Sequence, residues 1–404
     1  MKSILGTKNC FGCGVCASVC PKNTIKIKLN FDGFYEPIIT NESDCIKCGL
    51  CNKVCSFNND YAFSEKPNIK SYAAWSRNST IREKCSSGGI AFEIGKSLIN
   101  QGYKVCGVRY NAEEKRAEHY IANTLDELVP SMGSKYIQSY TVDAFRNINR
   151  KQKYLVVGTP CQIASFRRYI QNFHCEENFV LMDFFCHGVP SYFAWKKYLQ
   201  EVEKKTGPIT YVSWRNKQTG WHDSWAMTCD INDSSEKVDW HDSYSMIIKE
   251  KKSLHYSRMS QGDAFYKLFL GDQCLGKACY DSCMFKYNHS LADIRVGDAW
   301  GHAYENDDKG VSAAISFTAK GDDLIHSCDC EIKEHSFILI TEFQMKTNAK
   351  RKFFHKKLMK LLRDENKNLE EIIRYVDFTR KISRQIDRIK HPLRTIKKAI
   401  GVLK

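Results

Sequence analysis

The chain has 404 residues, 19 cysteines and a formal net charge of +15. At about 150 residues per domain, this length predicts two or three domains, and no apolar run comes near the roughly 18 residues that a membrane span needs. Because no signal-peptide apolar region precedes the first cysteines, we expect a cytoplasmic protein whose cysteines serve metal or redox chemistry and not a disulfide framework.

Two cysteine runs mark the N-terminal part of the chain. CFGCGVCASVCP and CIKCGLCNKVC share the spacing C-x2-C-x2-C-x3-C. This spacing is typical of bacterial ferredoxins with two 4Fe-4S clusters, in which the fourth cysteine of each run ligates the other cluster. Zinc ribbons need pairs of cysteines and not two quartets, which disfavours them. The predicted ligand sets are Cys10, Cys13, Cys16 with Cys55, and Cys45, Cys48, Cys51 with Cys20.

The segment between the two runs alternates between apolar and polar residues, with Asp32-Gly33 in its middle. This pattern predicts a β-hairpin that turns at Gly33. Gly12, Gly14 and Gly49 stand inside the cysteine runs, where we expect them to let the backbone approach the cluster sulfides.

From residue 71 onward, apolar strands alternate with amphipathic helices. This order predicts an α/β domain with at least partly parallel strand pairing. The expected strands are 72–75, 104–110, 154–157, 179–185, 209–214 and 293–297. The expected helices are 90–100, 162–172 and 192–204.

The segment CSSGG places Ser87, Gly88 and Gly89 at the start of the helix predicted for 90–100. Free N–H groups at a helix N-terminus form an anion site that suits a cofactor phosphate. An ordinary serine cap followed by a tight turn is the alternative interpretation.

Two cysteines follow apolar strands directly. Cys161 comes after the strand 154–157, and Cys186 comes after 179–185. Ligands bind at the carboxyl ends of strands in open α/β sheets. With Cys279 and Cys283, these thiols would complete a cluster or zinc site, but spacing alone leaves structural cysteines equally open. A Cys-His hydrolase is disfavoured because no motif supplies Cys161 with a base.

The ordered segments SSGGIA, VVGTPCQIASFRRY, MDFFCHGVPS, VSWRNKQTGW and CYDSCMFK with ADIRVGDAWG resemble the beta subunit family of coenzyme F-420 hydrogenase and dehydrogenase. The resemblance covers residues 72–320, and the N-terminal ferredoxin fusion is also similar to members of that family. It implies a ferredoxin-like domain at 1–58, a linker at 59–70, a mixed α/β flavin-binding domain at 71–340 and a helical tail at 341–404. The expected fold is therefore α+β followed by α/β.

Members of this family bind FAD beside an iron–sulfur cluster, so the resemblance implies FAD and a third 4Fe-4S cluster here. The implied cluster ligands are Cys161, Cys186, Cys279 and Cys283. The family pair is usually C-x2-C, whereas CYDSC has one more residue, so Asp281 or Cys274 is the alternative fourth ligand. The implied flavin and anion contacts are Ser87, Gly88, Gly89, Thr159, Gln162, His187, Arg215 and Lys217. No side chain is required as a covalent catalyst, and His187 is otherwise a turn residue or ring contact.

The expected function is an oxidoreductase that passes electrons between a hydride donor or acceptor such as coenzyme F-420 and 4Fe-4S clusters through FAD. The alternatives are a reductase of another substrate, as in bacterial relatives associated with surface polysaccharide synthesis, and a non-catalytic electron-transfer subunit. The expected partner is a redox protein or a small-molecule hydride donor or acceptor.

The tail carries most of the positive charge. From residue 345 to the end there are 19 Lys or Arg against 6 Asp or Glu, with apolar residues at helical spacing. This pattern predicts helices that pack on the domain as a solvated extension. The alternative is a basic amphipathic surface for an anionic membrane or an acidic protein. Nucleic acid is not expected, because no reading motif accompanies the charge.

Overall fold

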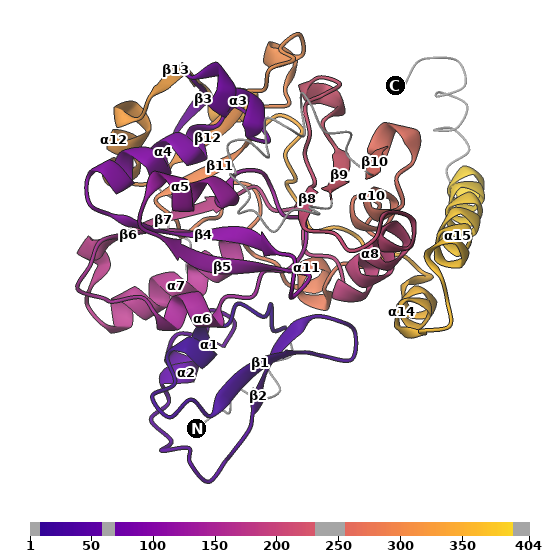
Figure 1. The fold of residues 1–404 in the computed structure, drawn as a ribbon, viewed down its shortest axis with the longest axis horizontal. Helices are drawn as coiled ribbons and strands as arrows, with labels where there is room; N and C mark the ends of the chain where they lie inside the picture. Colours follow the sequence, from indigo (N-terminus) through magenta and orange to yellow (C-terminus); the bar gives the residue numbers. More distant parts are fainter. Residues whose placement is uncertain (1–8, 59–68, 231–254, 391–404) are drawn as a thin grey trace.

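The computed structural model describes residues 9–58, 69–230 and 255–390 (Figure 1). The first of these ranges forms a small module with a β-hairpin and two single-turn helices. The hairpin pairs β1 (Ile25–Leu29) with β2 (Tyr35–Ile39), and the helices are α1 (Val15–Ser18) and α2 (Leu50–Lys53). Gly33 has a φ of 78° in the hairpin turn, so the turn lies where the sequence predicts it.

An eight-stranded mixed sheet forms the centre of the molecule, in the order β13-β3-β12-β11-β7-β6-β4-β5. The pairs β4/β6, β6/β7 and β7/β11 are parallel, and the outer pairs are antiparallel. The carboxyl ends of β6 and β7 therefore meet at one edge of the sheet. The strands are β3 (Lys70–Ser76), β4 (Lys104–Asn111), β5 (Arg116–Ala122), β6 (Tyr154–Val157), β7 (Phe179–Phe184), β11 (Ile294–Asp298), β12 (Ser312–Ser316) and β13 (Cys330–His335).

Helices cover both faces of this sheet (Figure 1). On β6, Leu155 faces a core shared with α4 (Ile90–Asn100), α5 (Leu125–Leu128) and α12 (Ala319–Ser327). Its neighbours Tyr154 and Val156 face the opposite core, with α6 (Val142–Arg146) and α7 (Pro160–Asn172). This alternation is the two-residue period of a strand buried on both faces. The N-terminal module packs on the second core, where Val15, Val19 and Val54 join the residues of α6 and α7.

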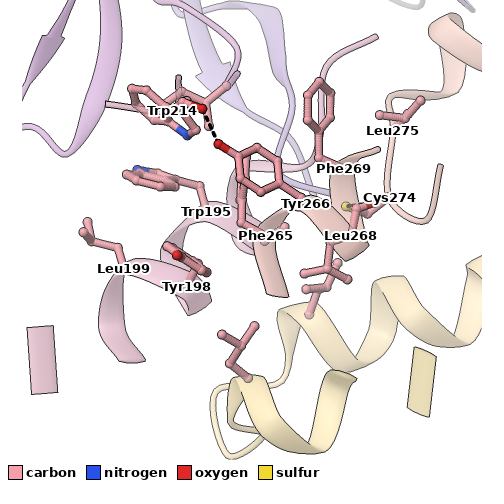
Figure 2. Close-up of a cluster of buried hydrophobic side chains, with 14 of the residues drawn as sticks. Trp195, Tyr198, Leu199, Trp214, Phe265, Tyr266, Leu268, Phe269, Cys274 and Leu275 are labelled. Carbon is pink, nitrogen blue, oxygen red and sulfur yellow. Dashed lines mark hydrogen bonds between the residues drawn. The ribbon is translucent and has the colours of Figure 1, made fainter. Parts of the chain in front are cut away.

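A second, three-stranded sheet lies beside the first, in the order β10-β9-β8. Its core is rich in aromatic residues, and Figure 2 shows the Tyr266 hydroxyl donating a hydrogen bond to the Trp214 carbonyl among them. The elements of this region are β8 (Tyr211–Ser213), β9 (Ala226–Asp230), β10 (His255–Arg258), α8 (Tyr192–Thr206), α10 (Ala264–Phe269) and α11 (Lys277–Asp281).

The tail forms α14 (His355–Arg363) and α15 (Leu369–Lys390), which continue this aromatic core through Leu358, Ile372 and Val376. The expected packed helical extension is confirmed for α14 and the first half of α15, whereas no described side chain of α15 after Thr379 is buried. Residues 391–404, which the sequence also predicts as helical, lie outside the described residues. No helix in the described ranges is both long and apolar enough to cross a lipid bilayer.

The strand expected at 209–214 differs most from the sequence prediction. It is ordered as β8 over three residues only, and it pairs with β9 in the second sheet and not with the parallel strands. The helix expected from residue 162 begins at Pro160, since proline is suited to the first turn of a helix. The short helices α3 (Ser79–Lys84) and α13 (Phe337–Ile340) complete the described fold.

Candidate functional site

The first predicted ligand set lines one cavity in the N-terminal module. Cys10, Cys13, Cys16 and Cys55 surround it, together with Gly12 and Gly14. Gly12 has a φ of 66°, and a Cβ there would lie 2.3 Å from the Tyr35 carbonyl oxygen, so only glycine fits. The Gly12 amide donates to the Cys10 sulfur at 3.3 Å. Donors to cysteine sulfur are one of the means by which a protein sets the potential of a cluster.

The second set lies closer to the surface. Burial raises the pKa of Cys51, and the neighbouring Cys48, Cys20 and Cys45 add to the effect in that order. The structure thus brings the fourth cysteine of the first run to the first three of the second. Cys45 and Cys48 are exposed, whereas Cys13 and Cys16 are buried. The second set is therefore the side of the module that an external redox partner can approach.

A third group of thiols lines a cavity at the carboxyl edge of the large sheet. Cys161 lies in the first turn of α7, and Cys186 follows β7 by two residues. Cys279 belongs to α11, and Cys283 follows that helix. The cavity that these four residues line encloses ≈ 510 Å³ free of protein atoms, part of it open to solvent.

The two alternative fourth ligands lie elsewhere. Cys274 is fully buried in the aromatic core, where its thiol points toward the Leu268 carbonyl oxygen, and it does not line the cavity. The carboxylate of Asp281 accepts a hydrogen bond of 2.6 Å from Arg351. The extra residue in CYDSC is thus accommodated by the end of α11 at Asp281, which still leaves Cys283 facing the cavity.

The four thiols are close enough for each one, when ionised, to disfavour the ionisation of the others. Burial raises the pKa of Cys161 well above its ordinary value, and Cys186, Cys279 and Cys283 act in the same direction. Such a set becomes stable as thiolates when a cationic metal core offsets their mutual repulsion. The ammonium group of Lys286 lines the same cavity and lowers the pKa of Cys186, although burial has the larger, opposite effect.

The thiols surround a volume and do not meet at a point. In the part of the chain that the structure describes, no three His, Cys, Asp or Glu side chains converge closely enough to hold a single metal ion. The Lys286 ammonium donates to the carbonyl oxygens of Cys186 and His187 and so fixes the backbone that carries Cys186.

Three phenylalanines connect the first cavity with the third. Phe11 lies between the ligands Cys10 and Cys13, yet it lines the third cavity together with Phe285. Phe57 lines the first cavity, and its ring stacks on Phe11 with 4.2 Å between centroids. The Phe57 and Phe285 rings meet edge to face at 6.2 Å. The two thiol cavities are therefore separated by packed aromatic rings.

The glycines before α4 are required by backbone geometry. A Cβ on Gly88 would lie 2.1 Å from the Ala74 carbonyl oxygen, and Gly89 has a φ of 94°. Gly89 is the N-cap of α4 and supplies no side-chain cap, so the first amides of this helix have no capping oxygen. The hydroxyl of Ser87 donates to the Val311 carbonyl oxygen at 2.7 Å. The serine-cap interpretation is wrong for this helix, and an uncapped N-terminus remains.

Arg215 and Lys217 lie behind this loop. The fully buried Arg215 guanidinium pairs in two-point fashion with Asp298, at 3.0 Å for each contact, and also donates to the Ser86 carbonyl. Lys217 donates to the carbonyls of Ser87, Arg82 and Lys309. Burial lowers the pKa of Lys217 to about 8. Both cations thus hold the loop, and their contact with an anionic ligand stays a prediction.

Thr159 and Gln162 border the four-thiol cavity and also form a capping box for α7. The side-chain oxygen Oε1 of Gln162 accepts from the Thr159 backbone amide at 2.8 Å, and the Thr159 hydroxyl lies 3.1 Å from the Cys161 sulfur. His187 does not line this cavity: its Nε2 lies 2.9 Å from the Asp272 carboxylate, and its ring meets Phe269 edge to face.

Gln138 and Lys286 are site residues that sequence reasoning missed. Gln138 lines the third cavity, and its side chain bonds the backbone of the N-terminal module at Tyr35 and Phe11, more than a hundred residues away. No local motif could reveal such contacts. For Lys286 the available signal was its position three residues after Cys283.

A cysteine-lined cavity beside a ferredoxin-type module defines this chain as an iron–sulfur protein of the electron-transfer class. Residues 9–59 match the model of the 4Fe-4S dicluster domain. Residues 71–146 and 151–337 match the models of the N-terminal and C-terminal parts of the coenzyme F420 hydrogenase/dehydrogenase beta subunit. The chain therefore belongs to the coenzyme F420 hydrogenase/dehydrogenase beta subunit family, which is a family of oxidoreductase subunits.

The structure is also similar to a chain of the F420-reducing [NiFe] hydrogenase complex from Methanosarcina barkeri, with a TM-score of 0.44 and 15% sequence identity. The similarity covers 80% of this chain and 95% of that chain. No curated protein matches the sequence.

Proposed function

We propose that this protein is an iron–sulfur flavoprotein oxidoreductase, which passes electrons between a hydride donor or acceptor resembling coenzyme F-420 and three 4Fe-4S clusters, with FAD between them. The proposed domains are 1–58 for the two-cluster module, 71–340 for the flavin and third cluster, and 341–404 for the tail, with 59–70 as linker. The observation that carries the proposal is the third cavity, because four cysteines from three separate segments line it.

The proposed ligands of the third cluster are Cys161, Cys186, Cys279 and Cys283. Burial and mutual repulsion raise the pKa of the Cys161 thiol, which is the electrostatic situation that a bound metal core relieves. Flavins exchange hydride as an electron pair and also exchange single electrons, as 4Fe-4S clusters do. The protein's part is to hold the sites at a fixed separation, exclude water and set the local charge.

Phe11, Phe57 and Phe285 support the proposed electron route. Their rings pack against one another between the first and third cavities. The second ligand set, with Cys45 and Cys48 exposed, supports a partner contact at the far side of the module. In this proposal the module lies between an external redox protein and the large domain.

The flavin is proposed from the family, and α4 supplies its candidate phosphate position. The uncapped N-terminus at Gly89 offers unbonded amides, and the close approach at Gly88 leaves the loop compact. Arg215 and Lys217 support an anion there by adding positive charge behind the loop, even though their own hydrogen bonds go to the protein. Thr159 and Gln162 are proposed to border the ring system at the thiol cavity, whereas the contacts of His187 with Asp272 and Phe269 leave it out of this set.

Analysis of the protein purified without oxygen tests this proposal. We expect about twelve irons per chain, from three four-iron clusters, together with one FAD. Adding reduced F-420, reduced ferredoxin or a reduced nicotinamide in separate samples then identifies the donor, as the one that bleaches the flavin absorbance. About twelve irons without bound or reconstitutable FAD would contradict the flavoprotein and leave an electron-transfer subunit. About eight irons would contradict the third cluster.

A further inference from the structure

The helix α15 changes its surroundings halfway along its length. In its first half, Ile372 and Val376 are fully buried in the aromatic core, and Lys267 of α10 pairs with Asp377 at 3.1 Å. Thr379 is the last buried residue on this helix within the described side chains. After it the helix continues to Lys390 at the side of the molecule, where it is drawn in yellow (Figure 1).

The outer half of α15 nevertheless carries an apolar stripe. Phe378, Ile382, Ile386 and Ile389 are spaced by four, four and three residues. At 3.6 residues per turn they fall within an arc of about 80° on one side of the helix. Phe378 is 60% exposed, Ile386 is 41% exposed and Ile389 is 79% exposed. Isolated apolar residues on a surface are ordinary, but a helical stripe of four is not.

The same helical face is covered in the first half of α15. Tyr375 lies on this face, one turn before Phe378, and its ring contacts Phe354 and the ammonium of Lys357 beside α14. The stripe therefore begins where α14 stops covering α15. On this face, Tyr375 in the first half of α15 has a partner within the domain, whereas Phe378, Ile386 and Ile389 in the outer half are exposed.

The charge around the stripe identifies the kind of partner. Arg380, Lys381 and Arg384 project from the other side of the helix at this level. From residue 378 to the end of the chain, the sequence has nine Lys or Arg and one acidic residue. A helix with an apolar arc and a cationic remainder is suited to lie in the interface of an anionic bilayer, where its apolar side enters the acyl boundary and its cations meet the headgroups.

We propose that the outer half of α15, residues 378–389, docks the protein peripherally on an anionic lipid surface. A second copy of the chain is the less favourable occupant, since two such helices would bring like charges together. An acidic protein would satisfy the cations but does not account for a stripe of one phenylalanine and three isoleucines. In this proposal the helix lies in the membrane interface and does not cross the bilayer, in agreement with its many charged residues.

Vesicle flotation of the full-length protein tests this proposal. The vesicles are phosphatidylcholine alone, or phosphatidylcholine mixed with phosphatidylglycerol. The stripe variant is Phe378→Ser with Ile386→Ser and Ile389→Ser, and the charge variant is Arg380→Gln with Lys381→Gln and Arg384→Gln. The matched control is Ile338→Ser with Phe343→Ser, since these residues are 76% and 64% exposed but lie outside α15. The substituted side chains are exposed except for Arg380, which is half-buried, and an unchanged iron content verifies that each variant folds.

We expect the wild type and the control to float with the anionic vesicles and not with the neutral ones. The stripe and charge variants should each lose at least about tenfold in partitioning, because each removes one of the two contributions to interfacial binding. Wild-type protein that stays unbound, or a control that loses as much as the stripe variant, would overturn the proposal. Two further results would also overturn it. One is a wild-type protein that is dimeric and binds no vesicles, while the stripe variant is monomeric. The other is a wild type and a stripe variant that bind polyglutamate equally strongly, with no binding to vesicles.

Discussion

Replacing Gln138 by leucine should loosen the N-terminal module from the large domain. The Gln138 side chain is 8% exposed and makes two hydrogen bonds across the junction: its oxygen accepts from the Tyr35 amide at 2.9 Å, and its nitrogen donates to the Phe11 carbonyl at 2.8 Å. Leucine keeps most of the volume but leaves both backbone groups without a partner. Each buried backbone group left without a hydrogen bond costs about 1 to 3 kcal/mol, so the free energy that holds the module to the large domain falls by about 2 to 6 kcal/mol.

Hydrogen exchange followed by mass spectrometry measures this loss directly. Since 1.4 kcal/mol corresponds to a factor of ten, peptides covering residues 10–40 should exchange at least about 30-fold faster. Gln101→Leu is the control, because Gln101 is exposed and its side chain donates only to the Ser97 hydroxyl, at 3.2 Å. Exchange in these peptides within about threefold of the wild type would refute the view that Gln138 fixes the module.

Two further variants test the charges behind the loop and beside the thiols. Arg215→Met leaves Asp298 without its buried partner and should lower the free energy of unfolding by about 3 to 5 kcal/mol. Arg109→Met is the control. It breaks the pair between the half-exposed Arg109 and Glu118 and should lower the free energy of unfolding by about 1 kcal/mol or less. Urea unfolding of both variants measures the difference, and equal losses would contradict it. Lys286→Met should lower the reduction potential of the third cluster, because a cation near the thiols favours the more negative reduced state; a potentiometric titration that finds it unchanged or higher would contradict this.

Local sequence patterns predicted the features that depend on nearby residues. The spacing of the two cysteine runs predicted which thiols meet, because the ligand loops are short. The strand ends predicted where Cys161 and Cys186 lie, because parallel strands share one carboxyl edge. The strand β13, by contrast, is half exposed and mostly polar, so its sequence gives no apolar period to recognise.

The residues that sequence reasoning missed act over long separations. Ile209 and Trp214 are apolar, which led the sequence to predict one continuous strand, yet the ladder forms only within Tyr211–Ser213 against β9. The stacking of Phe57 on Phe11 depends on how the module docks, which no local window contains. Packing between distant segments therefore sets the parts of the site that lie between the cavities.

The iron content of a matched pair of cysteine variants tests the central claim most directly. Cys161 is half-buried and lines the four-thiol cavity, whereas Cys274 is fully buried in the aromatic core and does not line it. Cys161→Ala should lose about four irons and keep the two clusters of the N-terminal module, and Cys274→Ala should keep the full wild-type content. If Cys161→Ala retained as much iron as Cys274→Ala, the third cavity would not be a cluster site.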